Sequence, residues 1–285
     1  MTEHGAQTGQ PEDGDDDSPY SLAWLGLREP ADARARAAEL VEPLRNLLPD
    51  ANPVVIRDLG CGSGSMGRWL AGQLPGPQHW MLYDREPGLL DHARDHLPRT
   101  AADGSPVSVR TRECDLTRLT ADDLAGASLV TASALLDLLT LAEVERLVTA
   151  CVDAGSPALL TLSVLGEVEF SPADPLDAEI AAAFNAHQRR GTGAQQLLGP
   201  DAVQATAEAF RRCGAEVRVR PSPWRLGPAE ADLTARWLRG WVAAAVEQRP
   251  ELAVPAAGYL ERRLAAATAG RLRVVVGHAD LLATS

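Results

Sequence analysis

The segment from Val54 to Gly64, Val-Val-Ile-Arg-Asp-Leu-Gly-Cys-Gly-Ser-Gly, constrains the fold of this chain more than any other. Its apolar start predicts a buried strand at 54–59, and the three alternating glycines predict a tight turn. Because glycine has no Cβ, such a turn can adopt positive φ and bring backbone N–H groups close to a ligand. A helix predicted at 64–74 completes a strand–turn–helix unit of the kind that binds nucleotides.

Three acidic residues end or border predicted strands. Asp58 precedes the first glycine, where a carboxylate could accept a hydrogen bond from a cationic amino group or order the loop, and would repel a pyrophosphate. Asp84 ends a strand predicted at 79–83, at the spacing expected of a carboxylate that holds a ribose. Asp115 follows a third strand, predicted at 107–112. The ordered set of acids indicates a nucleoside-binding sheet edge.

This arrangement resembles motif I of the class I S-adenosylmethionine (SAM) methyltransferases, in which an acid, any residue and Gly-x-Gly-x-Gly follow one another. The similarity is strong over residues 54–165, and it is greatest to generic small-molecule methyltransferase domains of high-GC bacteria. It implies a Rossmann-like α/β fold, with a mostly parallel seven-stranded sheet, helices on both faces and helical insertions. SAM would be the cofactor and S-adenosylhomocysteine the product. The cofactor-binding residues that the resemblance implies are Asp58, Gly60, Cys61, Gly62, Gly64, Asp84, Arg85, Asp115, Leu116 and Ser133.

The resemblance also implies roles for these residues. Asp84 would hold both ribose hydroxyls, and Asp115 would reach the adenine amino group, with a backbone contact from Leu116. Ser133, at the end of the strand predicted near 128–133, would line the methyl-transfer site. Either Arg28 or Arg57 could meet the SAM carboxylate, because a guanidinium pairs bidentately with it.

Two other functions fit parts of the sequence. Residues 62–67 also satisfy Gly-x-Gly-x-x-Gly, so an NAD(P)-dependent oxidoreductase is one alternative. A non-catalytic protein that keeps the SAM fold and acts as a regulator or scaffold is the other. Asp58 and Asp115 favour the methyltransferase interpretation, since dinucleotide domains usually carry an apolar residue at the first of these positions.

Composition limits the partners. Residues 1–18 contain six acids and neither Lys nor Arg, which predicts a disordered acidic tail ahead of a single domain at 19–285. The net charge is −12, and all 27 basic residues are Arg, so we expect neither a nucleic-acid partner nor a catalytic lysine. The four cysteines are widely spaced, which predicts no metal site, and no apolar run reaches the length of a membrane helix. We expect a cytoplasmic protein without a membrane partner.

The hydrophobic pattern predicts alternating strands and helices beyond the first unit. The helices are predicted at 30–48, 87–97, 141–152, 200–213, 229–248 and 251–268, and the later strands at 157–164, 215–220 and 272–276. Residues 166–198 read as an insertion that covers the substrate, and 222–270 as a second, helical insertion. Trp237 and Trp241 share one helix face in the second insertion, where they could form core, roof a pocket or support a homodimer.

Candidates for the chemistry follow the predicted strands, because ligands bind at the carboxyl ends of a parallel sheet. His187 is the candidate general base, since a neutral imidazole can accept a proton at pH 7, and Glu167 is the alternative. The acceptor would be a small molecule methylated on O, N or C. The predicted substrate contacts are Tyr20, Trp24, Asp137 and Asn185; for Asp137 a role as a helix cap remains open.

Overall fold

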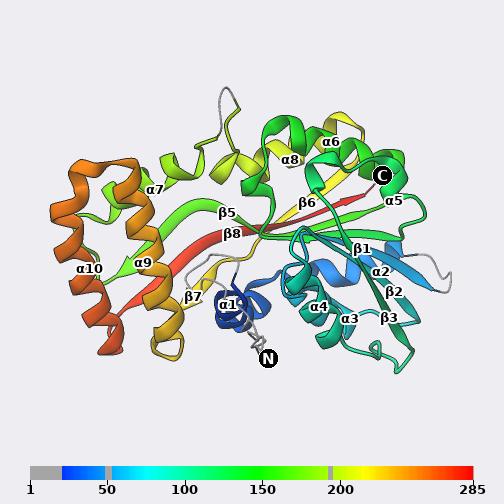
Figure 1. Cartoon of the computed structure of the whole chain (residues 1–285), viewed down its shortest axis with the longest axis horizontal. Coiled ribbons are helices and arrows are strands. Elements are labelled where there is room, and N and C mark those ends of the chain that lie inside the picture. Colours follow the sequence, from blue (N-terminus) through cyan, green and yellow to red (C-terminus); the bar gives the residue numbers. More distant parts are fainter. Residues whose placement is uncertain (1–20, 49–52, 192–194, 285) are drawn as a thin grey trace, which may run out of the picture.

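The computed structural model describes residues 21–48, 53–191 and 195–284. The acidic tail predicted at 1–18 lies outside these residues, as does Tyr20, one of the four predicted substrate contacts. The described residues form a central sheet with helices on both faces and a helical lobe at one end (Figure 1).

The sheet has the strand order β3-β2-β1-β4-β5-β8-β6, and the short β7 pairs with β8. Strands β1 to β5 pair in parallel, whereas β8 runs antiparallel to β5, β6 and β7. The predicted Rossmann-like, mostly parallel sheet is therefore confirmed, with β7 as an additional strand. The strand bounds are β1 Val54–Leu59, β2 Gln78–Asp84, β3 Val107–Glu113, β4 Leu129–Ser133, β5 Ala158–Ser171, β6 Glu216–Pro221, β7 Trp224–Leu226 and β8 Arg273–Thr284.

Helices cover both faces of this sheet because the central strands are apolar on both sides. One hydrophobic core joins the sheet to α2, α3 and α4, and a second joins the opposite face to α5, α6 and α8. Helices α1, α7, α9 and α10 contribute to a third core. The helix bounds are α1 Leu22–Ala35, α2 Val41–Leu47, α3 Ser65–Ala71, α4 Pro87–His96, α5 Ala121–Leu124, α6 Leu141–Asp153, α7 Asp177–Gln188, α8 Ala202–Arg212, α9 Ala231–Gln248 and α10 Ala253–Thr268.

The third core belongs to a lobe that the two longest strands carry. Strands β5 and β8 extend beyond the other long strands of the sheet. Their pairing has register shifts between Leu160 and Ser163 and between Val164 and Val168. Beyond these bulges, β7 pairs with β8, and α7, α9 and α10 lie around the extended strands (Figure 1). The predicted insertion at 166–198 thus begins as a continuation of β5, and the strand predicted at 157–164 was too short.

Trp237 and Trp241 belong to the core of this lobe. Trp241 is 2% exposed. Its ring stacks on that of Trp237 with the centroids 5.3 Å apart, and it lies 5.5 Å from the ring of Phe170 on β5. Of the three roles left open for this pair, packing in the core is the one that the contacts support.

The prediction of one continuous helix at 30–48 is wrong, because the helical conformation ends at Arg36. Helix α1 ends at Ala35, Arg36 has ψ of 136°, and a 3-10 turn at Ala38–Leu40 leads into α2. The N–H of Ala37 donates to the buried Asp280 carboxylate on β8, at 2.8 Å. This contact with β8 takes the place of a hydrogen bond within the helix. The local sequence pattern could not reveal it, because Asp280 is distant in sequence.

Candidate functional site

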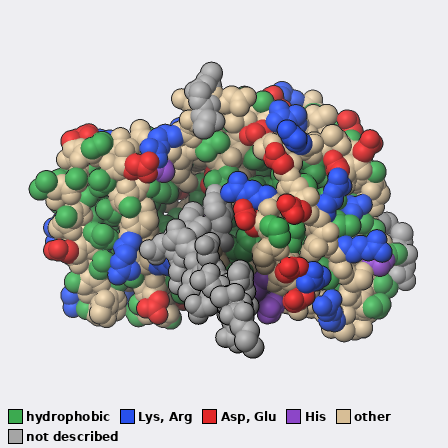
Figure 2. All heavy atoms as spheres, in the orientation of Figure 1, with side chains coloured by type: hydrophobic (Ala, Val, Ile, Leu, Met, Phe, Trp, Pro, Cys, Tyr) green, Lys and Arg blue, Asp and Glu red, His purple; other side chains and the backbone are tan. Residues whose placement is uncertain are grey.

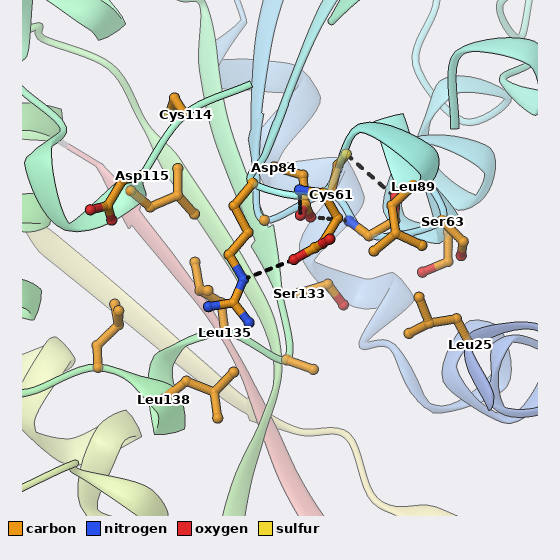
Figure 3. Close-up of a pocket in the computed structure, with 18 of the residues that line it drawn as sticks. Leu25, Cys61, Ser63, Asp84, Leu89, Cys114, Asp115, Ser133, Leu135 and Leu138 are labelled. Carbon is orange, nitrogen blue, oxygen red and sulfur yellow. Dashed lines mark hydrogen bonds and ion pairs between the residues drawn. The ribbon is translucent and has the colours of Figure 1, made fainter. Parts of the chain in front are cut away.

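A cavity of about 400 Å³ opens at the carboxyl ends of the parallel strands (Figure 3). The loops after β1, β2, β3 and β4 line it, together with one face of α1. Its walls are leucine-rich, with polar groups clustered on the glycine loop and the strand ends. The lining residues are Leu25, Arg28, Asp32, Gly60, Cys61, Gly62, Ser63, Ser65, Asp84, Arg85, Glu86, Leu89, Cys114, Asp115, Leu116, Thr117, Ser133, Ala134, Leu135, Leu138, Leu139 and Leu197.

The glycine loop after β1 forms one wall of the cavity. Gly60 and Gly62 have φ of +62° and +53°, a region that side chains with a Cβ rarely adopt. A Cβ on Gly60 would lie 3.2 Å from the Cδ1 atom of Leu135. Cys61 between them is buried, and burial raises the pKa of its thiol, so it lines the cavity as a neutral group.

Gly64, the third predicted glycine, does not line the cavity. Its φ is +86°, and a Cβ there would lie 2.9 Å from the Cβ of Ala93 on α4. This glycine therefore lets α4 pack closely against the start of α3.

Asp84 at the end of β2 holds the glycine loop in place. Its Oδ2 accepts a hydrogen bond from the N–H of Gly62 at 2.9 Å, and its Oδ1 accepts one from the N–H of Glu86 at 3.1 Å. Each carboxylate oxygen can accept a second bond, so the group keeps acceptor capacity toward the cavity. The neighbouring Arg85 also lines the cavity, and its side chain is 70% exposed and pairs with Glu86 at 3.5 Å.

Asp115 and Leu116 lie at the end of β3, on the far wall from α1. Oδ1 of Asp115 accepts from Oγ1 and from the N–H of Thr117, at 2.7 and 3.0 Å. These bonds hold the pKa of the Asp115 carboxyl below its usual range, the side-chain bond contributing most. Leu116 and Leu135 give this part of the cavity an apolar lining, and the Asp115 carboxylate lies beside it.

Asp58 lies behind the cavity, in the core of the sheet, and does not line it. It is fully buried, and its Oδ1 accepts from Oγ1 of Thr131 on β4 at 2.7 Å. Burial raises the pKa of Asp58 to about 7. This position does not support the predicted contact with a ligand's amino group, and the hydrogen bond to Thr131 ties β1 to β4.

A buried cation that the sequence pattern did not single out lies behind two serines of the cavity lining. Arg36 is 3% exposed, and its Nη2 donates to Oγ of Ser65 and to Oγ of Ser133, both at 3.1 Å. Ser133 also accepts from Oγ1 of Thr161, at 3.1 Å. The next residue, Ala134, lines the cavity with φ of +52°, an uncommon conformation for a residue other than glycine.

The wall formed by α1 contains a second arginine, which is already paired. Arg28 binds Asp32 through two hydrogen bonds of 2.9 and 3.3 Å, and its guanidinium lies 5.1 Å from the ring centre of Trp224. Asp32 also accepts from Nε1 of Trp224 at 2.9 Å. Arg57, the other predicted partner for a carboxylate, lies outside the cavity and donates to the carbonyl of Ala125 at 3.3 Å.

Residues 56–157, which include the glycine loop and the strand ends just described, match a family model whose description is a methyltransferase domain. This part of the chain is a methyltransferase domain of the class I SAM-dependent kind. A search of the curated proteins found none that matches this sequence.

Solved structures resemble this chain along nearly its whole length. The cyclopropane synthase MmaA2 from Mycobacterium tuberculosis aligns with a TM-score of 0.50 at 13% identity, covering 95% of this chain and 98% of that one. This likeness concerns the fold. A SAM-dependent methyltransferase from Geobacter sulfurreducens, solved in complex with S-adenosyl-L-homocysteine, aligns with a TM-score of 0.45 at 16% identity, covering 93% and 99%.

Both residues predicted as general bases lie outside the cavity. His187 is on α7, where its Nε2 lies 3.1 Å from a carboxylate oxygen of Glu247 on α9. Glu167 is exposed on the bulged part of β5, against Gly277. The structure does not bring either residue to the glycine loop.

The remaining predicted substrate contacts also lie outside the cavity lining. Trp24 packs against the lobe under the guanidinium of Arg236, at 5.7 Å. Asn185 ties α7 to β5 through a 2.8 Å hydrogen bond to the carbonyl of Gly166. Asp137 is in the turn after β4 and does not cap α6, whose N-cap is Thr140.

Two further findings concern the described residues as a set. Across 21–48, 53–191 and 195–284, no three acidic, histidine or cysteine side chains are grouped closely enough to hold a metal ion. In the same ranges, no helix has the length and apolar character needed to cross a bilayer.

Proposed function

We propose that this chain binds SAM in the cavity and transfers its methyl group to an O, N or C nucleophile of a small molecule. One observation carries the proposal: the glycine loop, the Asp84 carboxylate and the Asp115 carboxylate, from the ends of three adjacent strands, meet on one cavity. Each of these groups matches one part of an adenosyl ligand.

The residues present fit such a ligand. The backbone at Gly60 and Gly62 is open to the cavity, since neither residue has a Cβ to fill it. Asp84 retains lone pairs that can accept from two ribose hydroxyls. Leu116 and Leu135 would enclose the adenine, and the Asp115 carboxylate could accept from the adenine amino group.

When bound, SAM supplies a methyl group activated by its sulfonium. The protein then has to hold the two reactants in line, which can contribute a large part of the rate acceleration. We propose that the strand end at Ser133 and Ala134, which lines the cavity, contributes to this alignment. The one cavity carboxylate on α1, Asp32, is occupied by Arg28 and Trp224. His187 and Glu167 lie outside the cavity, so we infer that transfer depends on alignment and needs neither of them.

The side of the cavity next to this strand end is apolar. Leu25 lies on α1, Leu138 and Leu139 follow β4, and Leu197 follows α7. Burial of apolar surface would be the main source of affinity for an acceptor here. A small acceptor with an apolar body fits this wall better than a polyanion does.

Isothermal calorimetry with SAM, S-adenosylhomocysteine and NADH tests the assignment. We expect both adenosyl compounds to bind and NADH not to bind. Binding of NADH alone would overturn the proposal in favour of an oxidoreductase. Tight binding of SAM without turnover on any acceptor screened would instead support a regulatory or scaffold protein with a SAM fold.

A further inference from the structure

The buried Arg36 behind the cavity wall has more hydrogen-bonding capacity than the described protein uses. Its Nη2 bonds only the two serines, and its Nε and Nη1 have no partner among the described groups although the side chain is buried. Buried polar groups are nearly always paired, so this guanidinium calls for an explanation.

The charge of Arg36 is also not neutralised by a direct ion pair. Asp32, Asp58 and Asp280 are its acidic neighbours, yet no ion pair joins Arg36 to any of them within the described residues. Asp32 is held by Arg28, and Asp280 accepts from the backbone N–H groups of Ala37 and Leu162. The guanidinium lies 5.5 Å from the ring centre of Trp69, and its hydrogen bonds go to the two serines.

The two serines connect Arg36 to the cavity through hydrogen bonds. Ser65 and Ser133 both line the cavity, and each accepts a hydrogen bond from Arg36 through its Oγ. Among the described groups neither hydroxyl donates to a partner, so both O–H groups can donate into the cavity. Two O–H donors that share one buried cation make a site for an anion with two oxygens.

We propose that Arg36 is a positioning residue that orients Ser65 and Ser133 to bind the carboxylate at the amino acid end of the cofactor. This inference rests on the proposed function and assigns that carboxylate to a cation which does not itself line the cavity. Arg28, the more obvious candidate from its position on the wall, is engaged by Asp32.

The experiment compares two ligands that share the adenosyl group. S-adenosylhomocysteine has the carboxylate, whereas 5′-methylthioadenosine lacks the whole amino acid end. In calorimetry, Arg36→Met should weaken binding of S-adenosylhomocysteine by about 10-fold to 100-fold, the range for losing a charge-assisted hydrogen bond, and leave methylthioadenosine within about twofold. Ser65→Ala and Ser133→Ala should each produce a smaller loss with the same selectivity.

Matched controls separate this role from a structural one. Ser156→Ala removes another buried serine hydroxyl, which donates to the carbonyl of Ala127 at 2.9 Å away from the cavity, and should change neither affinity. Arg57→Met serves the same purpose for the arginine. Arg36→Lys keeps the charge and should restore part of the lost affinity.

Three outcomes would overturn the inference. Parallel weakening of both ligands would mean that Arg36 only supports the fold of the loop. Unchanged binding of S-adenosylhomocysteine in all three variants would place the carboxylate elsewhere. If Arg36→Met fails to fold in a thermal unfolding assay, the serine variants decide, and wild-type selectivity in both would refute the proposal. Failure of the wild type to bind either ligand would count against the proposed function itself.

Discussion

Asp84 has two expected tasks, which are holding the glycine loop and binding the ribose. Replacing it and comparing the result with a matched control should separate the two. The carboxylate accepts from the N–H groups of Gly62 and Glu86 and faces the cavity. Asp84→Ala removes both loop bonds and both acceptors offered to the ribose. A hydrogen bond to a charged group contributes about 1.5–3 kcal/mol, so losing two ribose bonds should cost at least about 3 kcal/mol of binding free energy.

That loss corresponds to a weakening of S-adenosylhomocysteine binding by at least roughly a hundredfold, measurable by calorimetry. Asp103→Ala is a matched control, because Asp103 also accepts from two backbone N–H groups, those of Gly76 and Ser105, at 3.0 Å each. It lies outside the cavity lining. Both variants should lose comparable stability, but only Asp84→Ala should lose affinity. Near wild-type affinity in Asp84→Ala would refute the ribose assignment.

Three other substitutions test the site and its supports. Gly64→Ala should lower the free energy of unfolding by about 3 kcal/mol, because it combines a positive φ with a contact to Ala93 on α4; a chemical denaturation curve identical to wild type would contradict this. His187→Ala should leave methyl transfer within about twofold, and a hundredfold loss of kcat would restore it as the general base. Asp58 has a pKa raised to about 7 when folded, so the folded state binds more protons than the unfolded state between pH 4 and 7, and wild-type stability should fall as pH rises through this window. Asp58→Asn should remove that decline and be more stable than wild type, relative to pH 4, by a few kcal/mol at pH 8; parallel pH–stability curves would show that Asp58 does not titrate this way.

The local unit at 54–64 and the strand ends could be predicted because their signals are local. Alternating glycines, apolar runs and a following acid depend on neighbours in sequence, and the structure places Gly60, Gly62, Asp84 and Asp115 on one cavity as expected. Periodicity also gave the two long helices at 231–248 and 253–268 nearly to the residue.

What could not be predicted depends on contacts between distant segments. The break at Arg36 arises from a hydrogen bond to Asp280, more than two hundred residues away in sequence. His187 was a reasonable base by chemistry, yet its helix packs against α9 in the lobe, which only the extension of β5 and β8 explains. Asp58 has the expected sequence position, but its depth in the sheet follows from its contact with Thr131 on another strand.

The long strand β8 has a consequence for how the chain reaches its folded state. Its first half contributes Val274 and Val276 to the core of the lobe, and its second half contributes Leu281 and Leu282 to the cores on the two faces of the sheet. Until residues 273–284 have been synthesised, three cores are incomplete and β5 and β6 lack the strand that lies between them. Non-local pairing of this kind slows folding and leaves strand edges exposed. A nascent chain that stalls before this point therefore leaves β5, β6 and β7 each without the β8 strand they pair with, which exposes it to aggregation and to binding by chaperones.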